Sequence, residues 1–311
     1  MSSITDLSTP EEPVSQADDA PSPPRKAKTQ RVGIGFALAG ALTAVIFAGG
    51  WWWTGAALFA LFQGFRELTV IYRAKGVSPS QAIVLAVGVA LILLAHFGKT
   101  GYILPIVTLG IISGFIRLLF RQPRASINDI GATFLAIFYV GFLPMHFILL
   151  RNLVAQPDLA PWLQPGAFYV FFTSLVIAMS DVGAYYAGRL FGRRLLYPAI
   201  SPKKTREGAV GGLIIGLAFG LGFAGLPHFN WIHAVILSLL LIVVAQLGDL
   251  AESLMKRDAG VKDSGGLFLG HGGLLDRLDS FLFCGVTAYY YIHWVILRQG
   301  VASEFLHWLP R

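Results

Sequence analysis

Long apolar stretches, separated by short polar segments, run through most of the chain after residue 31. Each stretch is close to the roughly 20 residues that an α-helix needs to cross a bilayer. The pattern predicts an all-α, polytopic integral membrane protein with about nine transmembrane helices. We expect these helices at about residues 32–49, 51–68, 81–98, 101–119, 130–150, 166–188, 209–226, 231–249 and 279–298.

The first 31 residues have a different composition. They are rich in Pro, Ser, Asp and Glu and end in a cluster of basic residues, which predicts a disordered cytoplasmic tail. The basic cluster and the apolar run after it resemble the start of a signal peptide, but no clear cleavage site follows, so we expect a retained first helix. We divide the remainder into N-terminal transmembrane helices, 32–165, and a C-terminal transmembrane region, 166–311, which holds the polar motifs.

The positive charges indicate the orientation of the helices. If the N-terminus is cytoplasmic, the inside segments hold 20 of the 24 Lys and Arg residues, and the outside segments hold the other four. Such an excess of positive charge on one side is typical of cytoplasmic loops. The distribution predicts a topology in which the N-terminus lies inside and the C-terminus lies outside.

Composition supports the membrane assignment and changes how the net charge is interpreted. The chain is 55% hydrophobic and 13% charged, whereas a soluble domain has about 25% charged residues. A net charge of +7 would suggest nucleic acid in a soluble protein. Here we expect no nucleic-acid partner and assign the charge to cytoplasmic loops that meet anionic lipid and phosphate. The single cysteine, Cys284, lies in an apolar run and gives no information about the redox compartment.

Glycine recurs every fourth residue from 208 to 220, which places one small-residue face on the predicted helix. Such a face lets a neighbouring helix approach closely. Gly220, Gly222 and Gly225 also match the spacing G-x-G-x-x-G, but they lie inside an apolar helix with no preceding strand. We therefore exclude dinucleotide binding there, and no P-loop motif is present.

Chemistry-bearing side chains are concentrated between Gly248 and Ser280. Asp249 closes one predicted helix, and Asp276 and Asp279 project from one face near the start of the next. Two carboxylates on one helix and a third across a loop are suitable ligands for Mg²⁺, which prefers oxygen and keeps waters that phosphates can replace. The residues therefore predict an Mg²⁺ site, and a second cation is left open.

The same segment contains basic side chains and a high density of glycine. Glycine frees the backbone to approach an anion at the N-terminus of the last helix, which favours negative charge. The alternative is a solvated loop with simple ion pairs, such as Lys262 with Asp263, but carboxylates at membrane depth are costly without a function. The basic residues that can neutralise phosphate oxygens are Lys256, Arg257, Lys262 and Arg277.

Two further segments are candidates for substrate contacts. The sequence SPKKTREG from Ser201 to Gly208 contains Lys203 and Lys204, although a basic loop also serves simply to orient the helices. Asp181 lies in the middle of an apolar run, where an acid is a functional candidate or a buried partner of a base such as Arg189.

These residues together resemble the signature of the phosphatidate cytidylyltransferases, also called CDP-diacylglycerol synthases. The segments at 181–185 and 201–208 are similar to other parts of that family, so the resemblance covers roughly residues 166–298. Leu269 stands where the family usually has proline, which should change loop stiffness rather than chemistry. The matching run consists of Ser253, Lys256, Arg257, Lys262, Asp263, His271, Gly272, Gly273, Asp276, Arg277 and Asp279.

The resemblance implies the reaction CTP + phosphatidic acid → CDP-diacylglycerol + pyrophosphate, in a polytopic fold that is often dimeric. It makes the region 166–311 catalytic and assigns the metal to Asp249, Asp276 and Asp279. The implied catalytic residues are Asp249, Lys256, Arg257, Lys262, Asp263, His271, Asp276, Arg277 and Asp279. The implied substrate-binding residues are Asp181, Ser201, Lys203, Lys204, Thr205, Glu207, Ser253, Gly272 and Gly273.

Two other functions remain as alternatives. A CTP-dependent kinase of a polyprenol or dolichol would share the nucleotide but not the acceptor. A secondary transporter would spread its charges over two repeated halves, and the sequence has no such repeat. Under the favoured interpretation the protein lies in the cell's inner membrane with its active site facing the cytoplasm.

Overall fold

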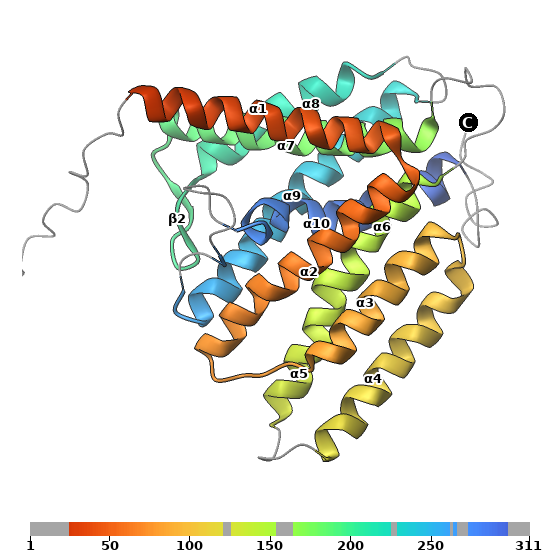
Figure 1. Ribbon diagram of the computed structural model, residues 1–311. Helices are drawn as coiled ribbons and strands as arrows, with labels where there is room; N and C mark the ends of the chain where they lie inside the picture. Colours follow the sequence, from red (N-terminus) through yellow and green to blue (C-terminus); the bar gives the residue numbers. More distant parts are fainter. Residues whose placement is uncertain are drawn as a thin grey trace, which may run out of the picture. The chain divides into compact units, whose positions relative to one another are not determined.

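The computed structural model describes residues 25–120, 126–153, 164–224, 229–261, 264–265 and 273–297 (Figure 1). These residues are almost all helical, apart from one short antiparallel hairpin. The helices are α1 Arg25–Ala48, α2 Gly50–Ala74, α3 Gln81–His96, η1 Thr100–Tyr102, α4 Ile103–Leu119, α5 Ile127–Ala136, η2 Ile137–Phe142, α6 Leu143–Arg151, α7 Pro165–Phe191, α8 Arg206–Leu221, α9 Trp231–Asp258, α10 Leu275–Tyr290 and η3 Tyr291–Ile296. The strands are β1 Leu195–Tyr197 and β2 Ser201–Thr205.

Each predicted span coincides with a helical segment of the structure. The largest differences are at ends predicted from charge to be cytoplasmic: α1 already begins at Arg25, and α2 and α9 continue to Ala74 and Asp258. The extensions carry residues such as Arg, Glu, Lys and Met, which favour helix even though they are too polar for an apolar window. The all-α prediction is confirmed, with the hairpin as a small addition.

Four helical segments are long and apolar enough to cross a membrane among the residues that the structure describes. They are Thr100–Arg117, Ile127–Arg151, Pro165–Phe191 and Trp231–Asp258. Two shorter apolar helices, Ala37–Ala48 and Gln81–His96, accompany them. The count of nine crossings and the orientation therefore stay predictions.

The described chain forms two compact units, residues 1–42 and 43–311. Residues 1–24 of the predicted disordered tail lie outside the described part, and helix α1 begins at Arg25. The larger unit contains helices from both sides of residue 165, and α10 contacts α2, α6 and α7 as well as α9. The domain boundary predicted at residue 165 stays a prediction.

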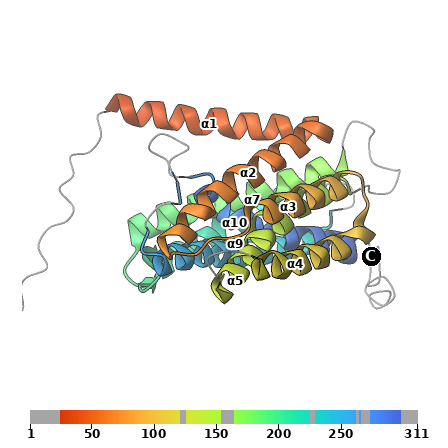
Figure 2. The ribbon, with the colours of Figure 1, turned by 60° about the horizontal axis from the view of Figure 1, so that its bottom comes forward.

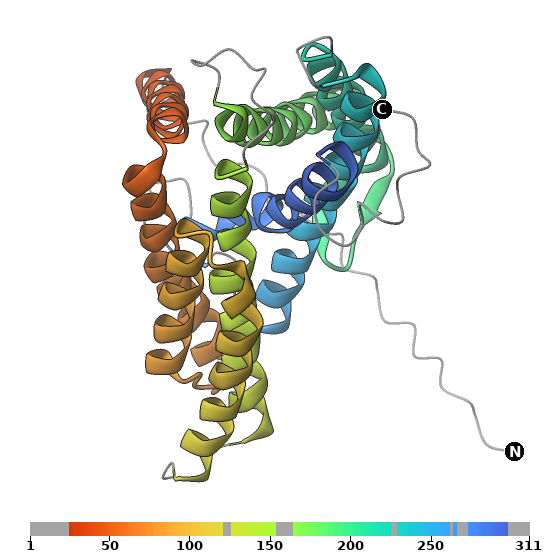
Figure 3. The same ribbon diagram turned by 90° about the vertical axis from the view of Figure 1, so that its right-hand side faces the viewer.

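Within the larger unit, α3 lies between α2 and α4 (Figure 2). Helix α7 crosses the direction of α3 and α4 rather than following it, and it packs along α8 (Figure 3). The predicted small-residue face is confirmed, because Gly208, Gly212, Gly216 and Gly220 are all buried. A Cβ at Gly212 would lie 2.8 Å from the carbonyl oxygen of Ser180 on α7, which explains why this position needs glycine.

Candidate active site

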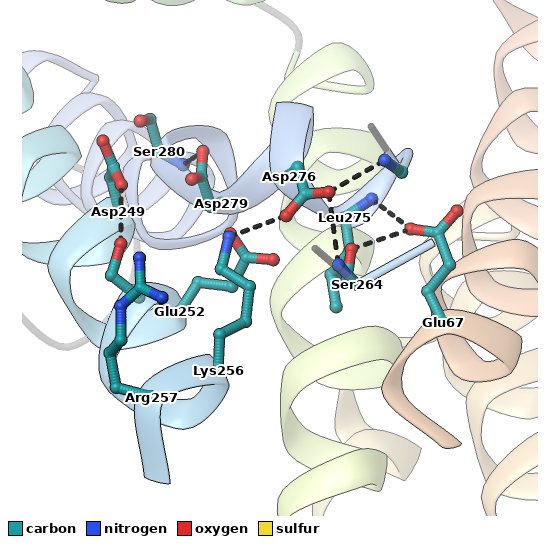
Figure 4. Close-up of polar contacts among 12 residues, drawn as sticks. Glu67, Asp249, Glu252, Lys256, Arg257, Ser264, Leu275, Asp276, Asp279 and Ser280 are labelled. Atoms are coloured by element: carbon teal, nitrogen blue, oxygen red, sulfur yellow. Dashed lines mark hydrogen bonds and ion pairs between the residues drawn. The ribbon is translucent and has the colours of Figure 1, made fainter. Parts of the chain in front are cut away.

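Helices α9 and α10 pack against each other, as the arrangement of the three predicted metal ligands requires. The two helices approach closely at Gly248, where a Cβ would lie 2.6 Å from the carbonyl oxygen of Asp279. This close approach brings the α9 residue that follows, Asp249, towards the α10 carboxylate of Asp279, and the two side chains interact electrostatically (Figure 4). Glycine at position 248 is therefore a structural requirement of the site.

Asp249 contacts two elements through its two carboxylate oxygens. Oδ1 accepts a hydrogen bond of 3.3 Å from the hydroxyl of Ser253, one helical turn later. Oδ2 forms an ion pair with the ammonium group of Lys204 on β2. The ion pair joins the hairpin to α9, so two segments that were predicted separately from the sequence meet here.

Lys256 lies between two carboxylates. Its Nζ is 3.0 Å from Oε2 of Glu252 on the same helix and 2.6 Å from Oδ1 of Asp276 on α10. Glu252 is completely buried, and its other oxygen, Oε1, has no hydrogen-bond partner among the described residues. A buried carboxylate oxygen without a donor is costly, so this environment favours an additional positive group.

Asp276 stands in the first turn of α10 and binds the loop before it. Its Oδ2 accepts hydrogen bonds from the backbone N–H of Gly273, at 2.8 Å, and of Ser264, at 3.4 Å. Burial alone would raise the pKa of Asp276, but the hydrogen bonds from Lys256 and the backbone outweigh it and hold the pKa below its usual value. Asp276 is therefore ionised and fixed in place at neutral pH.

Asp279 is 8% exposed and accepts a 2.6 Å hydrogen bond from the backbone N–H of Ser280. It also interacts electrostatically with Glu252. Over the described ranges, no three His, Cys, Asp or Glu side chains are already gathered around one point that could hold a metal. Within the predicted set, Asp249 and Asp279 interact electrostatically. The role of Asp249, Asp276 and Asp279 as metal ligands stays a prediction.

A polar cavity of about 450 Å³ opens beside Asp249. It is formed by α7, the hairpin, the start of α8 and the middle of α9. Its wall includes two of the predicted acids and both lysines of the SPKKTREG segment. The polar residues that line it are Ser180, Asp181, Tyr185, Arg189, Lys203, Lys204, Thr205, Gln246 and Asp249.

The remaining residues of the hairpin segment have local structural contacts. The hydroxyl of Thr205 caps α8 by accepting a hydrogen bond of 3.1 Å from the N–H of Gly208. Glu207 accepts hydrogen bonds from the N–H groups of Arg193 and Arg194, at 3.1 and 3.2 Å, and these backbone donors lower its pKa. Thr205 and Glu207 therefore shape the hairpin, and their contact with substrate stays a prediction.

The profile of the cytidylyltransferase family matches residues 29–295, most of the chain. The chain belongs to this family. A protein of Synechocystis sp. named phosphatidate cytidylyltransferase is 36% identical over 284 residues, which cover 83% of this chain and 93% of the relative. A Bacillus subtilis protein of the same name is 44% identical over 159 residues, or 50% of this chain and 55% of that one. Phosphatidate cytidylyltransferase 4, chloroplastic, of Arabidopsis thaliana is 33% identical over 300 residues, or 88% and 75%.

Some of the remaining predicted site residues of this cytidylyltransferase lie among the residues that the structure describes, and others lie outside them. Arg257 is exposed and donates from Nε to the carbonyl oxygen of Ile200, at 3.4 Å, which ties the end of α9 to the hairpin. Arg277 is exposed on the first turn of α10, and Ser201 begins β2. The predicted residues Lys262, Asp263, His271 and Gly272 lie outside the described residues.

Two acids of the site were not selected from the sequence. Glu252 lies three residues after Asp249 and four before Lys256, so helical spacing alone could have placed it beside them. Glu67 of α2 is 2% exposed and contacts the start of α10. Glu67 lies near the end of an apolar run, whereas Asp181 was selected because it lies in the middle of one, where an acid is costly without a function.

Proposed function

We propose that the protein is a membrane-embedded phosphatidate cytidylyltransferase, which makes CDP-diacylglycerol and pyrophosphate from CTP and phosphatidic acid. One observation carries the proposal. In a member of the cytidylyltransferase family, the α9 carboxylate of Asp249, which interacts electrostatically with Asp279 of α10, lines a cavity together with Lys203 and Lys204. The names of the relatives from Synechocystis, Bacillus and Arabidopsis support the same reaction.

The reaction is one displacement at phosphorus. A phosphate oxygen of phosphatidic acid forms a bond to the α-phosphorus of CTP, and the bond from that phosphorus to the bridging oxygen of the β-phosphate breaks. Pyrophosphate leaves with the electron pair. Because the attacking oxygen already belongs to an anion, the protein needs no Ser or Cys nucleophile. Its work is to position two anions and to neutralise the charge that keeps them apart.

The basic side chains divide between the two sides of the site. Lys256 and Arg257 on α9, with Arg277 on α10 and Lys262 between the helices, would bind the phosphates of CTP. Lys203 and Lys204 would bind a phosphate in the cavity, from either CTP or the lipid headgroup. Lys204 already has an anionic partner in Asp249, so a phosphate would replace or share that contact.

The donor set fits Mg²⁺. The oxygens are carboxylates, which are hard ligands, and Glu252 Oε1 is buried without a hydrogen-bond partner in the described part of the chain. Asp249, Asp276 and Asp279 would hold the ion, with a second cation left open. Bound there, Mg²⁺ supplies positive charge against the triphosphate and the leaving pyrophosphate.

The proposal includes nine membrane crossings, a cytoplasmic N-terminus and an outer C-terminus. It places the protein in the inner membrane with the active site facing the cytoplasm, as a homodimer without a nucleic-acid partner. Cysteine labelling tests the orientation, because the native Cys284 is completely buried. An impermeant thiol reagent should label Trp231→Cys in intact cells, but Arg193→Cys only after permeabilisation. Labelling of Arg193→Cys in intact cells would overturn both the topology and the cytoplasmic site.

An assay with several acceptors tests the reaction. Purified protein is incubated with Mg²⁺, CTP labelled on the α-phosphate, and phosphatidic acid, diacylglycerol or a polyprenol. We expect label in a lipid product and release of pyrophosphate only with phosphatidic acid. Release of CDP together with a newly phosphorylated lipid alcohol would establish the CTP-dependent kinase instead. The absence of turnover with every acceptor would favour the transporter alternative.

A further inference from the structure

Glu67, on α2 in the N-terminal half of the chain, contacts the start of α10 more than 200 residues away in sequence (Figure 4). Its side chain is buried, and both carboxylate oxygens accept hydrogen bonds from the backbone of α10's first turn. Oε1 lies 2.9 Å from the nitrogen of Leu274, and Oε2 lies 2.7 Å from the nitrogen of Leu275. The carboxylate thus binds two N–H groups that have no partner inside the helix.

This contact corrects one expectation from the sequence. The N-terminus of the last helix was expected to face a substrate anion, but the anion found at Leu274 and Leu275 is the Glu67 carboxylate. Two further donors bind the Glu67 carboxylate. Gln63 Nε2 lies 2.6 Å from Oε1, and the hydroxyl of Ser264 lies 3.4 Å from Oε2. A carboxylate can accept several hydrogen bonds, so the two oxygens of Glu67 can accommodate all four donors.

Glu67 and Asp276 bind neighbouring residues and share one of them, Ser264. The backbone N–H groups of Ser264 and Gly273 donate to Asp276, while the Ser264 hydroxyl and the N–H groups of Leu274 and Leu275 donate to Glu67. The two acids therefore hold Ser264 and the residues at the start of α10 from two sides.

Two glycines make room for Glu67. The three nearest atoms that a Cβ at Gly265 would meet all belong to Glu67, and the first is its Cγ at 2.8 Å. A Cβ at Gly273 would meet the Glu67 carboxylate and the Ser264 hydroxyl. The glycines between α9 and α10 therefore serve the approach of an acid from α2.

We propose that Glu67 is a positioning residue, which holds Ser264 and the N-terminus of α10 in the arrangement that binds CTP. The proposal rests on the proposed function, because that function assigns the triphosphate to the basic residues of α9, α10 and the segment between them. Glu67 contacts Ser264 and the start of α10. It affects substrate binding indirectly, by positioning Asp276 and the backbone around it.

The test is Glu67→Gln, measured by steady-state kinetics with varied CTP and saturating phosphatidic acid. Gln keeps the size of the side chain but has one acceptor oxygen, so an NH₂ group faces one of the two backbone donors. Loss of one hydrogen bond to a charged group costs about 1.5–3 kcal/mol, so the equilibrium should shift at least about tenfold away from the competent arrangement, and the apparent KM for CTP should rise. Saturating CTP selects the competent arrangement, so kcat should remain within about twofold of wild type.

The split between KM and kcat separates positioning from folding. A variant that merely folds less well has fewer active molecules, which lowers the rate at every CTP concentration and leaves KM unchanged. The matched control is Lys75→Ala, which removes the other ion pair from α2, to Asp258, where both side chains are exposed. This control should keep the wild-type KM for CTP.

Amide hydrogen exchange gives a readout without substrate. In Glu67→Gln, exchange in a peptide that covers Leu274 and Leu275 should be at least about tenfold faster, because these N–H groups lose a carboxylate acceptor. Exchange in α3 should not change. This experiment needs no turnover. An inactive wild-type protein would count against the proposed function, but the exchange measurement would still test whether Glu67 holds the start of α10.

A double-mutant cycle tests the geometry. Gly265→Ala should raise the KM for CTP in the wild-type background, because its new methyl group collides with Glu67. In the Glu67→Ala background the colliding atoms are absent, so Gly265→Ala should have little additional effect. An unchanged KM for CTP in Glu67→Gln, unchanged exchange at Leu274 and Leu275, or additive effects in the cycle would each overturn the proposal.

Discussion

The two sides of the site differ in how firmly their charged groups are held. On the α9–α10 side, Glu252 and Asp279 are buried, and Asp276 is fixed by Lys256 and two backbone N–H groups. On the hairpin side, Lys203 is exposed, and Lys204 is tied to the rest of the site through one ion pair with Asp249. The acids are thus set before substrate arrives, whereas the lysines can still exchange partners.

This difference indicates a division of labour. A metal-binding carboxylate must be ionised and fixed, because each missing ligand leaves charge on the phosphates unscreened. A lysine that binds a phosphate and later releases it is better placed at an exposed position, where its partner is weakly held. Substitution of the proposed metal-binding acids should therefore affect turnover, and substitution of the hairpin lysines should affect substrate affinity.

The largest effect is expected from removing one charge on the acidic side. Asp249→Asn, Asp276→Asn and Asp279→Asn should each lower kcat at least about 100-fold, because charge stabilisation in a water-poor site is worth several kcal/mol. Asn keeps the size of Asp, so the fold should persist. The rates are measured in the α-phosphate assay at saturating CTP and lipid.

The thermal unfolding midpoint of each variant serves as the control for folding. Near-normal rates for both Asp276→Asn and Asp279→Asn in well-folded protein would show that the metal assignment is wrong. The division between an acidic catalytic side and a basic binding side would then fail as well.

The sequence was sufficient for the approximate positions of the described helices. Apolar runs locate the spans because a membrane requires about 20 consecutive apolar residues, and this constraint acts locally along the chain. The i, i+3 spacing of Asp276 and Asp279 likewise places both on one face of α10. Local rules therefore predicted the parts of the site that lie on single helices.

Contacts between distant segments could not be predicted in this way. Glu67 and Leu275 are 208 residues apart, and no periodicity in either segment indicates that they meet. The ion pair between Lys204 and Asp249 also depends on how the hairpin folds onto α9. Such contacts are set by helix packing, here by close approaches at glycines such as Gly248, which one sequence does not specify.

On the basic side, Lys204→Gln should raise an apparent KM about tenfold, because one charge-assisted contact to phosphate is lost. Its kcat should fall much less than that of the Asp variants. The KM values for CTP and for phosphatidic acid are measured separately, and the one that rises identifies the occupant of the cavity. Unchanged KM values for both substrates would contradict a role for Lys204 in binding phosphate.

The two sides should also differ in how they respond to acid. The folded pKa of Asp276 is lowered, so its contribution to stability is present above its unfolded pKa, about 4, and is lost as pH falls through the folded value. Below about pH 4, the unfolding temperature of purified wild-type protein should therefore fall more steeply with pH than that of Asp276→Asn. Equal slopes would contradict this contribution.

Glu207 provides the comparison from the hairpin side. Backbone N–H groups also lower its pKa, so its contribution has the same sign and is lost over the same acid range. Glu207 is solvent-exposed in this contact, and water and salt screen the interaction. Glu207→Gln should keep nearly the wild-type slope of unfolding temperature against pH, which sharpens the contrast with Asp276.

The smallest effect is expected at Asp258, the last residue of α9, which belongs to neither side of the site. Its ion pair with Lys75 is 2.9 Å long, but the side chains are 66% and 44% exposed, and such pairs contribute about 0.2–1 kcal/mol. Asp258→Asn should therefore change kcat and both KM values by less than about twofold and leave the unfolding temperature almost unchanged. A loss comparable to that of Asp276→Asn would mean that any charge removed near the end of α9 impairs turnover, and the distinction between fixed catalytic acids and peripheral ones would have to be abandoned.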